Sequence, residues 1–298
     1  MSVRFHVLAS GSSGNASVLE VGEFGVLVDF GLSLRQLAPR MKRCRVSWEC
    51  IHAVLLTHAH TDHWQATMLS HFAKLRLPVY CHADHANEFD HQSRAFTALS
   101  AAGLIRHYEP GEPLQLHPDC RCVPVTLPHD AAMTNGFRFE GSGWAIGYAA
   151  DLGCWQPALA RQFADVDLLA LEFNHDVALQ LASSRHPLLI RRVLSDTGHL
   201  SNDQAARMFA EILQMSAPGR IRHLVQLHLS RECNRPDLAQ TAARQVLHRL
   251  ELDMPIHTTQ QHRVGPTIAL DGKMSIAQQS AFVQRLLPFT ISSSEAET

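Results

Sequence analysis

The segment LLTHAHTDHW begins at residue 55 and places three histidines and one aspartate within six positions. It overlaps the apolar run IHAVLLT (residues 51–57), which predicts a buried strand that leads directly into the cluster. Few packing requirements would collect four such side chains in one loop. Imidazole and carboxylate groups are the ligands that zinc, manganese and iron accept. The segment therefore predicts a metal site at the end of a strand.

The spacing within the cluster predicts how the side chains are shared between metal ions. Alternate residues of an extended segment point the same way, so His58 and His60 are placed to bind one ion together. Asp62 and His63 follow as the loop turns and are placed to reach a second ion. A two-metal site also needs a bridging carboxylate and further histidines from elsewhere in the chain.

Three later residues are candidates for those missing ligands, because each ends a predicted strand. They are His129 in VTLPHDA, Asp151 in IGYAADLG and His228 in LVQLHLS. A lone histidine is more often structural than a ligand, and this chain has 20 of them. These three residues can therefore be ligands only if the fold places them beside the first cluster.

Short apolar runs that read as strands alternate with helical segments along the whole chain. The predicted strands are 3–9, 16–22, 24–30, 51–57, 77–82, 122–127, 135–140, 143–150, 166–173 and 223–229. The predicted helices are 33–42, 65–74, 155–163, 202–215 and 237–250. No repeat or long linker divides this pattern. We therefore expect one α/β domain over residues 1–290, followed by a flexible polar tail over residues 291–298.

Composition narrows the class of protein. No apolar run approaches the roughly 20 residues of a membrane helix, and the N-terminus has no signal-peptide core. The seven cysteines are odd in number and include no CxxC pair, which indicates a reducing cytoplasm. The net charge of −2 argues against a tight architectural DNA-binding protein but is compatible with an enzyme that contacts a few phosphates. Oligomeric state is left open.

THAHTDH resembles the signature of metallo-β-lactamase-fold hydrolases, and His129, Asp151 and His228 match the later metal motifs of that family in order. The resemblance covers the chain from end to end. It implies an αββα sandwich, in which two mixed sheets face each other, helices lie outside and the site lies along one sheet edge. It also implies two divalent ions, zinc or manganese with iron as a further option.

The resemblance assigns the ligands of each ion. His58, His60 and His129 would hold one ion, whereas Asp62, His63 and His228 would hold the other, with Asp151 as the bridge. The implied reaction is hydrolysis by a hydroxide that bridges the two ions, and Asp62 would also orient that nucleophile. The chain departs from the family at Trp64, Gln65 and Ala66, where a small residue usually follows. We expect a slightly altered loop there and no lost ligand.

Three further segments bear on the substrate. The turn in LASGSSGN (residues 8–15) is suited to hold phosphate, with Ser12 and Asn15 as candidates, or is simply a tight turn. In LSDTGHLSND, His199 precedes a helix whose start is predicted at Ser201 and Asn202, a position that favours anions. Glu172 in LALEFNHD is placed to orient His199 as a proton donor for a leaving oxygen. The alternative interpretations are that Glu172 is a surface acid and that Ser201 is only a helix cap.

The order of LEFNHD, GHLSN and LHLSRECN resembles the YycJ/WalJ-like branch of the family, and more loosely tRNase Z. That resemblance implies a nuclease or other phosphodiesterase, DNA exonuclease-like, with nucleic acid as the substrate. The chain shows no protruding Gly/Pro-rich arm of the tRNase Z type and is too short for a β-CASP insertion. Two alternatives remain open: a hydrolase of a small cyclic phosphate, lactone or thioester, and a non-catalytic regulatory partner.

Overall fold

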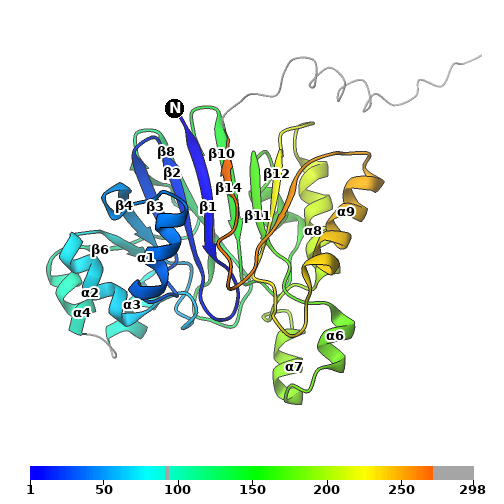
Figure 1. Ribbon diagram of the computed structural model, residues 1–298, viewed down its shortest axis with the longest axis horizontal. Helices are drawn as coiled ribbons and strands as arrows, with labels where there is room; N and C mark the ends of the chain where they lie inside the picture. Colours follow the sequence, from blue (N-terminus) through cyan, green and yellow to red (C-terminus); the bar gives the residue numbers. More distant parts are fainter. Residues whose placement is uncertain (91–93, 271–298) are drawn as a thin grey trace, which may run out of the picture.

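Two seven-stranded sheets form the centre of the protein, seen in a computed structural model that describes residues 1–90 and 94–270 (Figure 1). Across the first sheet the strands are β14 (Thr267–Ala269), β1 (Val3–Ala9), β2 (Ala16–Val21), β3 (Phe24–Val28), β4 (Ile51–Leu55), β5 (Val79–Cys81) and β6 (Ile105–His107). Across the second they are β13 (Ile256–Thr258), β12 (His223–Leu227), β11 (Leu168–Glu172), β10 (Trp144–Ala149), β9 (Asn135–Gly141), β8 (Cys120–Thr126) and β7 (Leu114–His117).

Helices cover the outer faces of both sheets. The helices beside the first sheet are α1 (Leu34–Arg43), α2 (Ala66–Leu75), α3 (Ala83–Asp90) and α4 (Arg94–Ala101). Those beside the second are α5 (Pro157–Gln162), α8 (Asn202–Met215) and α9 (Pro236–Arg249). Two short helices, α6 (Val177–Ala182) and α7 (Pro187–Val193), extend beyond the sheets at the bottom of Figure 1. The predicted αββα sandwich is confirmed.

Three hydrophobic clusters hold these four layers together. One lies between the sheets and contains side chains such as Phe5 and Phe137, and the others join each sheet to its helices. A strand in such a sandwich is covered on both faces, so its sequence is apolar without alternation. For example, every residue of β10 is buried. This is why the strand runs were readable from the sequence.

Strand direction gathers the ends of many strands at one edge. Strands β3 to β6 pair in parallel in the first sheet, as do β10 to β13 in the second. The carboxyl ends of parallel strands meet at the same sheet edge, where α/β proteins build their sites. The predicted position of the site along a sheet edge follows from this pairing.

Several predicted boundaries were too long. The run 24–30 ends as a strand at Val28, because Asp29 adopts a left-handed conformation with φ of 60°. The run 51–57 likewise ends at Leu55, and the helix predicted over 155–163 begins only at Pro157. The predictions for residues 291–298 and for a domain boundary at 290 concern positions outside the described residues.

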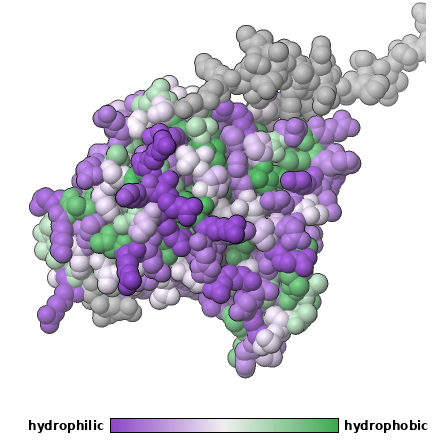
Figure 2. All heavy atoms as spheres, viewed as in Figure 1, coloured by the Kyte–Doolittle hydropathy of each residue, from purple (hydrophilic) through white to green (hydrophobic). Residues whose placement is uncertain are grey.

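The elements that sequence patterns did not predict are short ones. They are a 3₁₀ turn at Trp48–Cys50, β6, β7, β13, β14, α3, α4, α6 and α7. Helices α6 and α7 expose large apolar side chains, such as Leu181 at 61% and Leu188 at 65% exposure. Figure 2 shows hydrophobic atoms on the surface at the lower right, where Figure 1 places these helices. Within the described ranges, no helix is both long and apolar enough to cross a membrane.

Candidate metal centre

Asp29, which is fully buried and directly follows β3, supports the loop after β4. The Asp29 carboxylate accepts hydrogen bonds from the Thr57 backbone N–H at 2.9 Å and from the Thr57 hydroxyl at 3.0 Å. His63 Nδ1 lies 2.7 Å from Asp29 Oδ2, so it donates to that carboxylate and leaves Nε2 facing the site. A carboxylate behind a histidine ligand fixes its tautomer and orientation. Asp29 therefore orients His63.

The turn that contains Asn15 holds the same loop from the side. The Asn15 backbone N–H donates to the Asp62 carbonyl at 2.7 Å, and Asn15 Nδ2 lies 3.3 Å from Asp62 Oδ2 and 2.9 Å from His63 Nε2. Gly31 packs so closely that a Cβ there would lie 1.8 Å from the Asp62 carbonyl oxygen. The first predicted turn thus supports two of the predicted ligands.

The later ligands come from the ends of strands in the second sheet. Asp151 follows β10 and His228 follows β12, with φ values of 60° and 53°. This left-handed conformation is uncommon outside glycine and turns each side chain out of the strand path. His129, after β8, donates from Nδ1 to the Gly198 carbonyl at 2.9 Å, and its Nε2 lies 3.3 Å from His60 Nδ1.

The seven predicted ligands lie together in overlapping groups. In each group one ligand atom per residue lies within 4.8 Å of the others, and the groups are His58–His60–His129, Asp62–His63–His228 and His58–His63–Asp151. Asp151 therefore lies against both of the predicted three-residue groups. A fourth group combines Asp151 and His228 with Glu172 and His199.

Buried atoms without partners provide a test of whether these residues suit a metal. His58 Nε2 and Asp151 Oδ2 are buried and make no hydrogen bond among the described residues. Asp151 Oδ2 is 2.9 Å from His63 Nε2, but without the angles of a hydrogen bond. An unsatisfied buried polar atom is costly, and a divalent cation is the partner that nitrogen and oxygen donors converging in this way would share. The residues present therefore fit divalent metal ions.

The two three-residue groups differ in charge. Burial, followed by the neighbouring histidines, lowers the pKa of His58 well below its ordinary value, so its imidazole is neutral. At His228 burial acts in the same direction but is outweighed by Asp151, Asp62 and Glu172, which raise the pKa to about 10. Burial would raise the pKa of Asp62, but His63 and His228 lower it to about 2.

Glu172, at the end of β11, is the centre of a second network beside the ligands. Its Oε1 is 2.8 Å from His199 Nδ1 and 3.1 Å from His228 Nδ1, and its Oε2 accepts from the backbone N–H groups of Leu152 and Leu200. Burial would raise the pKa of Glu172, but His199 and His228 outweigh burial and lower it to about 2. Glu172 and His199 are thus paired through His199 Nδ1, and His199 Nε2 takes no part in this pairing.

The four residues predicted to bind phosphate lie in different surroundings. Ser201 caps α8, because its hydroxyl accepts from the Gln204 N–H at 3.2 Å. Asn202 exchanges two side-chain hydrogen bonds with Asn234 and is buried. Asn15 contacts the ligands as described, and only Ser12 has an exposed side chain. Their role in binding phosphate stays a prediction.

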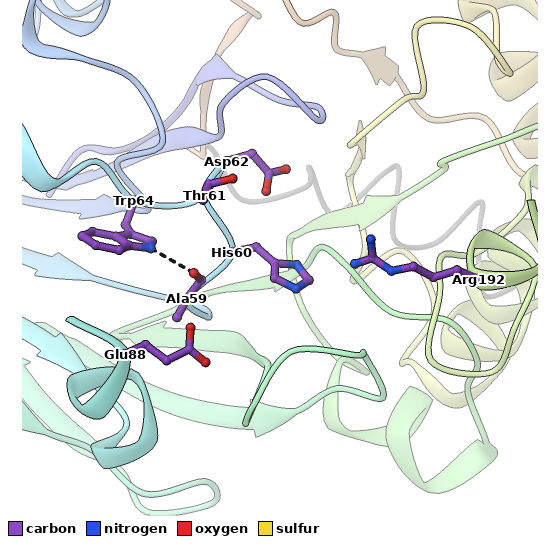
Figure 3. A pocket seen from close by; sticks show the side chains of 7 residues that line it. All are labelled: Ala59, His60, Thr61, Asp62, Trp64, Glu88 and Arg192. Carbon is purple, nitrogen blue, oxygen red and sulfur yellow. Dashed lines mark hydrogen bonds between the residues drawn. The ribbon is translucent and has the colours of Figure 1, made fainter. Parts of the chain in front are cut away.

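A pocket of about 400 Å³ lies beside the ligands and is open to solvent. Its lining residues are Ala59, His60, Thr61, Asp62, Trp64, Glu88 and Arg192 (Figure 3). The Trp64 indole N–H donates to the Ala59 carbonyl at 2.9 Å, and its ring packs on Phe89. No predicted ligand is displaced by it. Whether this loop differs from that of the family stays a prediction.

Sequence reasoning missed Asp29, Asp130, Glu88 and Arg192. Asp29 had a signal, because an acidic residue interrupts the apolar run FGVLVDF near its end. Asp130 also had one, since it follows His129 directly. Arg192 had none, because only the fold brings α7 to the pocket.

Comparisons with known proteins show to which family this chain belongs. A family model described as "Beta-lactamase superfamily domain" matches residues 25–219. The chain belongs to this superfamily. It is 28% identical over 252 residues to "Exodeoxyribonuclease YycJ" of Bacillus anthracis, which covers 83% of this chain and 90% of that protein.

Solved structures show the same fold. The metallo-β-lactamase-fold protein YhfI of Bacillus subtilis has a TM-score of 0.64 and 18% identity, covering 89% of this chain and 99% of YhfI. A diphosphatase of the PhnP family has a TM-score of 0.61 and 15% identity, covering 91% of this chain and 98% of that one. The superfamily and the ligand groups together make this chain a metallo-hydrolase.

Proposed function

We propose that this protein is a metal-dependent phosphodiesterase that removes nucleotides from nucleic acid, with DNA as the preferred substrate. The Glu172–His199 pair beside the ligand groups carries this proposal. Cleavage of a phosphodiester in nucleic acid expels an alkoxide, which is a poor leaving group unless it receives a proton. A histidine oriented by a carboxylate is suited to supply one.

His58, His60 and His129 would hold one divalent ion and Asp62, His63 and His228 a second, with Asp151 between them. When bound, two such ions lower the pKa of water and polarise a phosphoryl oxygen. Asp62 lines the pocket and has a 20% exposed carboxylate, so it is placed to orient the attacking water. His199 Nδ1 stays on Glu172, and its Nε2 donates a proton to the leaving oxygen.

The similarity to the exodeoxyribonuclease YycJ supports DNA as the substrate and removal of terminal nucleotides as the reaction. Zinc and manganese are both compatible with this ligand set, with iron as a third option. All seven cysteines are free, which supports a place in the reducing cytoplasm. Ser12, Asn15, Ser201 and Asn202 are retained as proposed contacts of the phosphate chain.

The proposal is tested with protein reconstituted separately with zinc and manganese. Single- and double-stranded DNA and RNA, labelled at either end, are offered together with bis(p-nitrophenyl) phosphate. We expect mononucleotide release from DNA. Cleavage of a thioester or lactam by protein that leaves every phosphodiester intact would contradict the proposal.

The variant His199→Gln tests the role of the proton donor. We expect turnover of DNA to fall by roughly 10²–10⁴-fold, the usual contribution of general acid catalysis. Turnover of bis(p-nitrophenyl) phosphate should fall much less, because p-nitrophenolate leaves without a proton. Equal losses on both substrates would show that His199 has another role. His248, on the exposed face of α9, provides the matched control as His248→Gln.

A hydrolase of small phosphodiesters is the second candidate. The pocket of about 400 Å³ is large enough for one nucleotide, and the fold is shared with a diphosphatase. Rapid hydrolysis of a cyclic mononucleotide by protein that is inactive on DNA would favour this candidate.

A further inference from the structure

Arg192 faces the pocket from the opposite side to the ligand loop. It lies near the end of α7 and lines the pocket together with His60 and Asp62. Figure 3 shows its guanidinium group directed toward the His60 imidazole across the pocket. Its side chain is 53% exposed, so the charge is open to a ligand. None of the roles assigned above uses this cation.

Asp130 holds Arg192 in this position. The Asp130 carboxylate accepts from Arg192 Nε and, at 3.0 Å, from Arg192 Nη2. A guanidinium group has five N–H donors, so this pairing uses one edge of the fork and leaves the Nη1 donors free. Asp130 Oδ1 also lies 3.4 Å from His129 Nε2 and 3.7 Å from His60 Nε2. Asp130 therefore links the orientation of Arg192 to that of two predicted ligands.

A purely structural role explains this pairing poorly. An ion pair with both side chains partly exposed adds little to stability, typically ~0–1 kcal/mol. The pair also joins a short helix with two exposed leucines to the rim of the pocket. A guanidinium group held in place at the rim of a pocket is well suited to bind an anion that enters the pocket.

We propose that Arg192 binds the phosphate next to the one being cleaved, so that the site prefers chains with at least two successive phosphates. This inference rests on the proposed phosphodiesterase function. The Asp130 carboxylate contacts the Arg192 guanidinium group on one side and His60 and His129 on the other. We therefore assign Arg192 to the phosphate beside the one held at the ligand groups. The neighbouring phosphate of a polynucleotide is the anion within its reach.

The side chains on the two opposite sides of the pocket, Arg192 and Glu88, agree with this assignment. The free guanidinium edge matches the two oxygens of a phosphate, which is a strong charge-assisted pairing. Glu88 on α3 lines the same pocket and is exposed, with its carboxylate on the far side from Arg192 in Figure 3. Repulsion from Glu88 directs a phosphate chain toward the Arg192 wall.

The experiment compares oligothymidylates that differ by one phosphate, from TpT with one to TpTpT with two, and longer members of the series. In wild-type protein kcat/KM should rise when the second phosphate is added. In Arg192→Ala this preference should fall on the order of 10-fold, through KM, as expected when a charged hydrogen-bonding pair is lost. Arg192→Lys keeps the charge without the fork and should fall between the two.

Arg191 provides the matched control. It lies beside Arg192 on α7, is exposed and does not line the pocket. Arg191→Ala removes the same charge and should keep the wild-type preference. Thermal unfolding of each variant checks that α7 still folds.

Each outcome decides between the two claims. If wild-type protein cleaves the series but Arg192→Ala keeps its preference, or if Arg191→Ala loses it equally, the inference is wrong and the proposed function stands. Wild-type protein that cleaves none of these substrates, nor longer DNA, overturns the proposed function and this inference with it.

Discussion

The first sheet contributes His58, His60, Asp62 and His63 from a single loop after β4, whereas the second contributes its ligands from separate strand ends. On the first side, neighbours in sequence set the relative positions of the ligands, and Asp29 and Asn15 support the loop from two directions. On the second side, the relative positions depend on packing between strands. The first side is thus a local cluster of proposed ligands, and the second is assembled by the whole fold.

The supports of the two sides also differ in kind. Within the described residues, the Asp29 carboxylate forms hydrogen bonds with His63 and Thr57, both in the loop after β4, and with none of the groups at the second sheet's strand ends. Glu172 contacts His228, a predicted ligand, and also His199, the proposed proton donor. Changes on the first side should therefore appear in metal affinity, and changes on the second in turnover as well.

The largest effect is expected when a ligand is removed from either side. His60→Ala and His228→Ala should each lose more than about 100-fold in activity, since even residues that only support ligands cost about 10–100-fold. Metal content measured by mass spectrometry should fall with activity in both. A variant that keeps its full metal content would remove that residue from the ligand set.

A smaller effect separates the two kinds of support. Asp29→Asn should weaken metal binding by about 10–100-fold. Its turnover should return when excess metal is supplied, because no proposed catalytic group is touched. Glu172→Gln should lose turnover that excess metal does not restore, since His199 loses its charged partner. The comparison is made by measuring the activity of each variant at increasing metal concentration. Identical curves for the two variants would show that the supports on the two sides do not differ in this way.

The smallest expected effect concerns His85, which connects the two sides. It lies on α3 and donates from Nε2 to the Met133 carbonyl at 2.7 Å, in the segment that follows His129. Burial lowers the pKa of His85 to about 4, so the folded protein holds this histidine neutral. The stabilising contribution is complete above the ordinary pKa of 6.5 and is lost as pH falls toward 4.

Metal-free protein should therefore lose on the order of 1–3 kcal/mol of unfolding free energy through His85 over that range. In His85→Gln this part of the acid dependence should disappear. Denaturant unfolding of both proteins at a series of pH values measures the difference. An unchanged acid dependence would show that His85 does not titrate with folding.

The same contrast explains what could be read from the sequence. The four proposed ligands of the loop could be picked out because their chemistry is concentrated in six residues. His129, Asp151 and His228 could be picked out because each follows a recognisable apolar strand, and the structure brings all seven residues together. The strands themselves were readable because both faces of each sheet are covered. Short elements such as α7 and β14 depend on contacts made after the sheets form, so their sequences carry little periodic signal.

Residues that act through the fold were the hardest to find. Arg192 and Asp130 are 62 positions apart in sequence, and each alone is an ordinary surface charge. Asp29 lies 34 positions before His63, and its role appears only when β3 and β4 pair. No spacing in the chain encodes these contacts, because each depends on which strands are neighbours.

The left-handed backbone at Asp29, Asp151 and His228 has a consequence for how such a site changes during evolution. Asparagine and aspartate tolerate this conformation far better than most residues, and β-branched side chains tolerate it least. A mutation at Asp29 or Asp151 therefore tends either to keep a small polar side chain or to damage folding as well as chemistry. Inactive descendants of this protein should carry asparagine at Asp29 and Asp151 far more often than alanine or valine.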